Sequence, residues 1–188
     1  MVPGVLIRLL AILQMVMVGA SAAPARETVR VLEGIAFKQV EFSAGSRRVT
    51  YEQPSGWRYF PGDAGGLKFY PPGRTSASVT VDVTPVDAPW VFDEAGEKRV
   101  HSSVLATIPG AAEEITLLDE ERSPLRLGGC PTFGVTYRYA WFGRHVRVHV
   151  LLASAEDCAI RITLVCHDAD FEELHKELRT SLYGWQLL

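Results

Sequence analysis

Several sequence features that identify functional classes are missing from this chain of 188 residues. Asparagine is absent, which excludes N-glycosylation at every position. No internal repeat, low-complexity tract or long linker divides the chain, so we expect one folded domain. No Gly-rich loop leads into Lys-Ser or Lys-Thr, and no Ser occupies a nucleophile elbow. The sequence therefore contains none of these catalytic or phosphate-binding motifs.

An excess of positive charge is missing as well. The chain has 19 basic and 22 acidic side chains, and residues 1–22 contain one of the basic residues and none of the acidic ones. Residues 23–188 therefore carry 18 basic and 22 acidic side chains, a formal net charge of −4. This balance excludes a broad basic surface for nucleic acid, so we expect no nucleic-acid partner.

The longest apolar run of the chain stands near its N-terminus. Arg8 is the only charged residue before the apolar run 9–18, and Ala20-Ser21-Ala22 follows as a small-x-small cleavage site. This layout predicts a signal peptide over residues 1–22 and a mature domain over residues 23–188. A transmembrane helix needs roughly 20 consecutive apolar residues, more than this run offers. We therefore expect an exported, periplasmic or secreted protein with no membrane span after cleavage.

Cysteine is scarce, although export would permit a disulfide. Cys158 and Cys166 flank a strand pattern that spans about 26 Å, whereas bridged Cα atoms lie roughly 4.4 to 6.8 Å apart. Only Cys130 can therefore pair with either of them. Residues 133–141, 146–152 and 158–166 are expected to form three consecutive antiparallel strands, and this arrangement places Cys130 near the turn before Cys158. It favours a Cys130–Cys158 bridge and leaves Cys130–Cys166 as the alternative.

Alternation of apolar and polar residues predicts strands over most of the domain. The expected strands are 36–42, 47–52, 58–60, 67–70, 77–84, 113–122, 133–141, 146–152 and 158–166. Ser123-Pro124 interrupts the chain after the sixth of these, which indicates an edge or bulged strand.

Two helices are expected as well. Asp93 can cap a helix over 94–107, and Asp168 or Asp170 can cap a final helix with an apolar stripe from Phe171 to Leu182. Together these elements predict an α+β fold: an antiparallel sheet of about six or seven strands flanked by two main helices in a layered sandwich.

The order of these elements resembles the PsbP-like superfamily, which includes exported bacterial DcrB-like proteins. The resemblance rests on the segment Tyr51-Glu52-Gln53-Pro54-Ser55-Gly56-Trp57 before a strand-turn-strand unit, and on the closing helix that begins at Asp170-Phe171. It covers about residues 36–185 and implies an antiparallel sheet flanked by helices. Because members of that fold mostly bind partners, it also implies a non-enzymatic role. No functional residue of the superfamily is carried over.

The last three expected strands, 133–141, 146–152 and 158–166, are joined by short turns and should form an antiparallel meander. One surface of this meander is rich in cations. If Trp141 pairs with Val146 and Leu152 with Cys158, three Arg and two His share one face of an otherwise acidic protein. These residues are Arg138, His145, Arg147, His149 and Arg161. Arg presents planar donors that suit carboxylate or phosphate, so the face is a candidate site for an anionic group. The alternative is a solvated face, or one paired with acids of a neighbouring helix.

The remaining chemistries have weaker patterns. His145 and His149 lie about 13 Å apart on a strand, too far to share one metal ion, so we expect neither a metal nor a cofactor. The preferred function is an exported, non-enzymatic domain that binds a protein partner or a small anionic ligand. The alternative is an exported hydrolase, which would need a Ser or Cys within hydrogen-bond reach of a His.

Overall fold

The computed structural model describes residues 25–62 and 66–188. The proposed signal peptide of residues 1–22 lies outside these residues. Their strands are β1 (Arg26–Leu32), β2 (Ile35–Ala44), β3 (Arg47–Tyr51), β4 (Arg58–Pro61), β5 (Leu67–Tyr70), β6 (Ser78–Pro85), β7 (Glu113–Arg122), β8 (Thr132–Trp141), β9 (Arg144–Ser154), β10 (Cys158–His167) and β11 (Gln186–Leu187). The helices are α1 (Glu94–Leu105) and α2 (Phe171–Leu182), and a short 3-10 turn over Asp168–Asp170 leads into α2.

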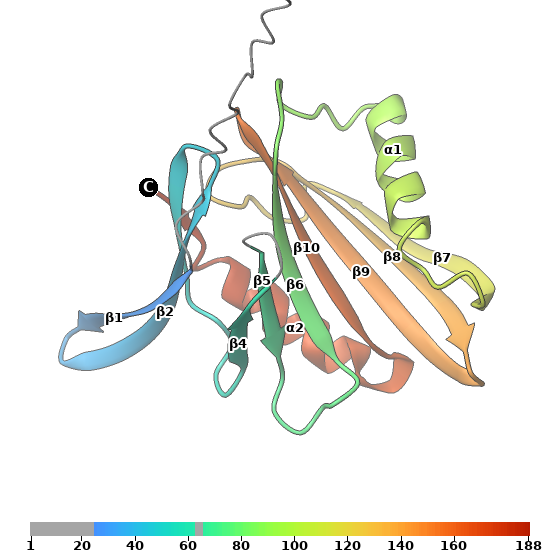
Figure 1. The fold of residues 1–188 in the computed structure, drawn as a ribbon, viewed down its shortest axis with the longest axis horizontal. Helices are drawn as coiled ribbons and strands as arrows, with labels where there is room; N and C mark the ends of the chain where they lie inside the picture. The colour runs from blue at the N-terminus through green and yellow to red at the C-terminus, as the bar shows by residue number, and fades with distance from the viewer. Residues whose placement is uncertain (1–24, 63–65) are drawn as a thin grey trace, which may run out of the picture.

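Two sheets form the body of the described chain (Figure 1). The larger has seven strands in the order β4-β5-β6-β10-β9-β8-β7, and the smaller has the order β1-β2-β3-β11. Every pair of neighbouring strands within these residues is antiparallel. The predicted α+β class with an antiparallel sheet and two helices is therefore confirmed, and β7 is an edge strand with bulges, as its Pro-interrupted sequence indicated.

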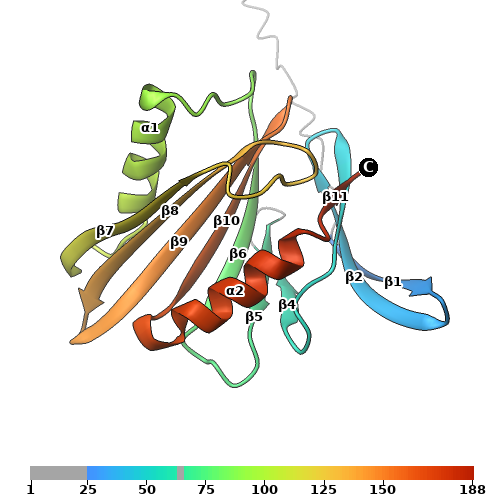
Figure 2. The ribbon, with the colours of Figure 1, turned by 180° about the vertical axis from the view of Figure 1, so that it is seen from behind.

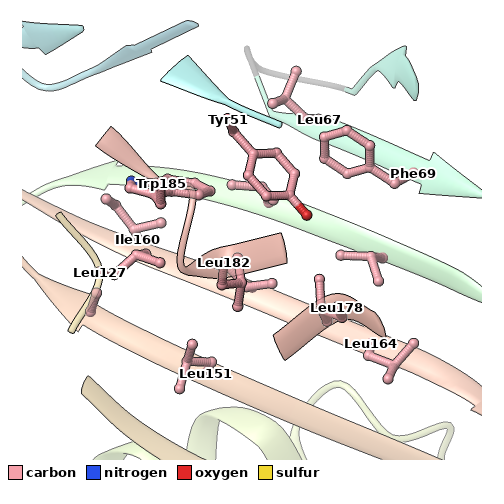
Figure 3. Packing of buried hydrophobic residues seen from close by; sticks show 14 of the residues in the cluster. Tyr51, Leu67, Phe69, Leu127, Leu151, Ile160, Leu164, Leu178, Leu182 and Trp185 are labelled. Atoms are coloured by element: carbon pink, nitrogen blue, oxygen red, sulfur yellow. The ribbon is translucent and has the colours of Figure 1, made fainter. Parts of the chain in front are cut away.

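The two helices pack on opposite faces of the large sheet. Helix α2 passes behind β6 and β10 in Figure 1 and crosses in front of the sheet in Figure 2. Its apolar stripe contacts the side chains of one sheet face, which we call the α2 face. There Leu178 and Leu182 pack with Leu151, Ile160 and the aromatic rings around Trp185 (Figure 3).

Helix α1 covers part of the other face, which we call the α1 face. Asp93 accepts a hydrogen bond from the Gly96 amide at 2.8 Å, which confirms the predicted N-cap. Val100 and Val104 then point to the sheet and pack with apolar residues of β8 and β9. Burial of both sheet faces explains why neighbouring residues from Val150 to Ala153 are all buried.

The predicted pairing within the meander is wrong at both turns. Phe142 and Gly143, with φ of 49° and 70°, form a two-residue turn, so Trp141 pairs with Arg144 instead of Val146. This shifts β8 against β9 by two residues and leaves each side chain on its expected face.

The second shift has a larger consequence. Leu152 pairs with Arg161 instead of Cys158, a change of three residues, which moves the side chains of β10 to the opposite face. The alternation could not decide between these registers because the end of β9 next to this turn, from Val150 to Ala153, is apolar on both faces.

Candidate functional site

The structure separates the five predicted site residues between the two faces of the large sheet. Arg138, His145, Arg147 and His149 share the α2 face, whereas Arg161 lies on the α1 face. The expected cluster of five cations on one face is therefore corrected to a group of four and a single arginine.

Arg147 is held by acidic side chains at the start of α2. Its guanidinium contacts the Asp168 carboxylate and lies 2.6 Å from a carboxylate oxygen of Glu172. It also lies over the Phe171 ring, 4.8 Å from the ring centroid. These contacts match the alternative in which the face pairs with acids of a neighbouring helix. Arg147 therefore anchors the beginning of α2.

His149 is buried beneath the same helix. Its Nδ1 lies 2.9 Å from the Thr136 hydroxyl, and its ring centroid lies 4.4 Å from that of His175 on α2. Burial, together with the nearby His175 and Arg179, lowers the pKa of His149 to about 3. His149 is consequently neutral at pH 7 and serves the packing of α2.

The other two residues of this face lie toward the β8–β9 turn. Arg138 is half-buried directly opposite Arg147, and His145 is exposed opposite Ala140. Repulsion between two adjacent guanidiniums is reduced here because Asp168 and Glu172 neutralise Arg147. This part of the α2 face is therefore a structural contact with a small exposed cationic margin.

Arg161 differs from Arg147 in its partners. Its Nε donates to the Thr163 hydroxyl at 3.3 Å, but its Nη2 is buried and has no hydrogen-bond acceptor among the described residues. Asp82 lies directly opposite on β6, beyond ion-pair distance. Burial lowers the pKa of the Arg161 guanidinium and Asp82 opposes this effect, yet an arginine stays charged. A buried donor without an acceptor is costly, so Arg161 has a hydrogen-bonding requirement that the described residues do not meet.

Arg161 faces a cavity of about 220 Å³ on the α1 face, beside the end of α1. Hydroxyl, carboxylate and aromatic side chains surround the guanidinium in this space, which we call the Arg161 cavity. It is lined by Thr80, Asp82, Thr107, Ile108, Tyr139, Val148, Arg161, Thr163 and Val165.

A second cavity of about 470 Å³ adjoins the first and shares Tyr139 and Val165 with it. We call it the Trp141 cavity, and it reaches the β8–β9 turn. Trp141 is 40% exposed and Phe142 is 86% exposed, with their ring centroids 5.1 Å apart. Phe142 adopts a left-handed conformation that bulky residues rarely adopt. A largely apolar, aromatic surface, which Ser76, Arg144 and His167 also line, thus lies next to the Arg161 cavity.

A larger hollow lies elsewhere, between α2 and the β3–β4 connection, with a volume of about 710 Å³. Its charged lining is mainly acidic, with Glu52, Glu173 and Glu177 against Lys176. Glu177 already accepts a hydrogen bond from the Trp57 indole at 2.9 Å. This hollow therefore offers no unpaired cation of the kind that Arg161 presents.

The three cysteines are thiols in the structure. Cys158 is buried in the cluster on the α2 face, and the half-buried Cys130 packs against the same cluster. Burial raises the pKa of the Cys158 thiol to about 11, and the proximity of Asp157 and Cys130 contributes. The predicted Cys130–Cys158 bridge stays a prediction, now between two residues near enough that Cys130 contributes to the raised pKa of the Cys158 thiol.

Two residues important for the Arg161 cavity were missed by sequence reasoning. Thr80 and Asp82 belong to the polar face of an alternating strand, a pattern visible in the sequence. What the sequence did not reveal is that β6 pairs with β10 and places Asp82 opposite Arg161.

The alternative function, an exported hydrolase, requires a Ser or Cys hydrogen-bonded to a His. Among the described residues, the hydroxyls hydrogen-bonded to histidine belong to Thr136 and Tyr137, and no Ser or Cys forms such a contact.

The described residues also contain no group of three metal-ligand side chains and no helix long and apolar enough to cross a membrane.

Comparison with solved structures identifies the fold. LpqN of Mycobacterium tuberculosis, involved in cell envelope biogenesis, matches over 87% of this chain and 91% of its own, at 17% identity and a TM-score of 0.54. CyanoP, the cyanobacterial PsbP of Synechocystis sp. PCC 6803, matches over 90% of this chain and 96% of its own, at 12% identity and a TM-score of 0.52.

The chain has the PsbP-like fold. This confirms the resemblance drawn from the order of elements around Pro54-Ser55-Gly56-Trp57 and the closing helix. No protein-family model matches the sequence, and no curated protein matches it. Because the sequence identities are 17% and 12%, these comparisons show the fold and do not show the function.

Proposed function

We propose that the protein is an exported, non-enzymatic binding domain that recognises an anionic group of a small ligand or protein partner at Arg161. The observation that carries this proposal is the buried, unpartnered Nη2 of Arg161 at an open cavity. Guanidinium donors suit carboxylate and phosphate oxygens, and binding one would satisfy the buried donor. Of the five cations proposed from the sequence, Arg161 is the one that combines a cavity with an unsatisfied buried donor.

Export is supported by the N-terminal sequence and by the fold. Residues 1–22 have the layout of a signal peptide, and LpqN, which shares the fold, is involved in cell envelope biogenesis. We propose that residues 23–188 act in the extracytoplasmic space. Intact-mass measurement of the protein purified from its native host tests this, because cleavage after Ala22 gives a chain that begins at Ala23. A full-length chain in the cytosolic fraction would refute the proposal.

The binding test uses simple anions. Isotope-labelled protein is titrated with sodium acetate and inorganic phosphate at constant ionic strength, and amide and arginine side-chain signals are followed by NMR. We expect saturable shifts at Arg161, Thr80 and Thr163, and their loss in Arg161→Met. The matched control is Arg30→Met, which removes an exposed arginine from β1 and leaves the shifts unchanged. Equal responses in wild type and Arg161→Met, or no saturable response, would contradict anion recognition at this site.

A further inference from the structure

We infer that the ligand is an organic monocarboxylate whose apolar body extends from the Arg161 cavity into the Trp141 cavity. This inference rests on the proposed function and adds the chemical class of the ligand. Its first support is proximity, because the two cavities lie on the same sheet face and share Tyr139 and Val165 in their linings; we call the two together the groove. Together they offer a space of the size that small-molecule sites usually occupy.

The two ends of the groove differ in polarity, and the end at Trp141 is the more apolar of the two. Arg161, Asp82 and threonine hydroxyls surround the first end. Val165 and Tyr139 line both ends. The second end is lined in addition by Trp141, Phe142 and Val146, together with Ser76, Arg144, Cys166 and His167. Arg161 and Val165 lie on the same strand face, four residues and therefore about 13 Å apart. A ligand that fills both ends must therefore be amphipathic and extended.

The charge of the ligand follows from Asp82. This exposed carboxylate lies opposite Arg161 on the neighbouring strand and has no ion-pair partner among the described residues. It attenuates the positive field at the guanidinium and repels a second negative charge on a bound group. A carboxylate, with one charge and two oxygens matched to the guanidinium fork, therefore fits better than a phosphate dianion.

The exposed aromatic side chains of the Trp141 cavity indicate that the apolar body of the ligand adds to the binding affinity. Trp141 is 40% exposed beside the more exposed Phe142, although large aromatic side chains gain most from burial. An aliphatic or aromatic body lying on Val165 and Trp141 would remove this surface from water. We expect each buried methylene to strengthen binding several-fold, by roughly the transfer free energy of that group.

The test compares four probes at pH 8, where a monoalkyl phosphate carries close to two charges. Sodium acetate, sodium octanoate, 1-octanol and monooctyl phosphate are titrated into the mature protein below their aggregation concentrations, and binding is followed by NMR shifts. We expect octanoate to bind at least about tenfold more tightly than acetate, octanol or octyl phosphate. Arg161→Met should weaken octanoate roughly tenfold or more and leave octanol unchanged.

Two further variants test the two ends separately. Asp82→Asn should bring the affinity for octyl phosphate up to that for octanoate. Trp141→Gln should reduce the advantage of octanoate over acetate, whereas the control Phe60→Gln, which removes an exposed aromatic on β4, should not. Thermal unfolding of each variant shows whether it is folded.

The outcomes separate the inference from the proposed function. Arg161-dependent binding of acetate and octanoate with equal affinity would overturn the amphipathic ligand and leave anion recognition intact. Tighter binding of octyl phosphate than of octanoate would overturn the monocarboxylate class. Absence of any Arg161-dependent binding, with acetate and phosphate included, would overturn both the inference and the proposed function.

Discussion

On the α2 face of the large sheet, Arg147 lies between the carboxylates of Asp168 and Glu172, whereas Arg161 on the α1 face has no carboxylate within ion-pair distance among the described residues. The difference follows from what covers each face. The turn before α2 brings acids onto its face, while the part of the α1 face around Arg161 borders cavities. The cation beneath the helix is therefore paired with acids of the fold itself, whereas the cation beside the cavity has no such partner among the described residues.

The largest expected effect concerns a covalent link on the α2 face. We predict that export leads to a Cys130–Cys158 disulfide, whose reduction lowers the free energy of unfolding by roughly 3 to 4 kcal/mol because it releases a long loop. Peptide mapping without reductant, together with urea unfolding with and without reductant, measures both. The bridge should disappear in Cys158→Ser and persist in Cys166→Ala. Three free thiols in protein from the native extracytoplasmic fraction would refute it.

The next effect tests the ion pairs of the same face. Arg147→Met should lower the free energy of unfolding by about 2 to 3 kcal/mol, because it leaves Asp168 and Glu172 unpaired and removes the contact with Phe171. The value lies below that of a fully buried pair because Glu172 is exposed. Urea unfolding measures it. A loss below about 0.5 kcal/mol, typical of a surface residue, would show that Arg147 does not anchor α2.

The buried histidines make the same face sensitive to acid. The pKa of His149 is about 3 in the folded protein and near 6.5 when unfolded, so below pH 6.5 the unfolded state takes up a proton that the folded state does not. Stability is therefore present above pH 6.5 and is lost as the pH falls. Between pH 7 and pH 5 the loss from His149 is about 2 kcal/mol.

Denaturant unfolding across this pH range checks the prediction. The pKa of His175 is also lowered by burial, so it adds in the same direction. His149→Gln should remove most of the slope between pH 7 and pH 5, whereas His145→Gln, at an exposed position of the same strand, should retain it. An unchanged slope in His149→Gln would assign the acid sensitivity to other groups.

The sequence predicted the positions of most strands and of both helices, but not which face of the sheet each arginine occupies. Alternating residues located the strands, and Asp93 and the stripe from Phe171 to Leu182 located the helices, because these signals are local. Strand β1 was not expected, and its residues are exposed or only partly buried, so the segment has no buried face to produce a clear pattern.

The location of Arg161 depended on information that is not local. Val150 to Ala153 are buried on both sides of β9, so either pairing with β10 keeps apolar residues together. The turn around Ala155, whose amide donates to the Cys158 carbonyl at 2.9 Å, decides the register. Sequence reasoning therefore identified Arg161 as a candidate but placed it on the wrong face and missed Asp82.

The smallest expected effect on stability is the one that distinguishes the two faces most directly. Arg161→Met keeps the apolar stem and removes a partly buried charge that has no carboxylate partner, so the free energy of unfolding should change by less than about 1 kcal/mol, or increase. Arg147→Met, the same substitution on the other face, should be clearly destabilising. Urea unfolding of the two variants under identical conditions gives the comparison. A large loss in Arg161→Met would mean that Arg161 holds the sheet together as Arg147 does, and that its free donor is not reserved for a ligand.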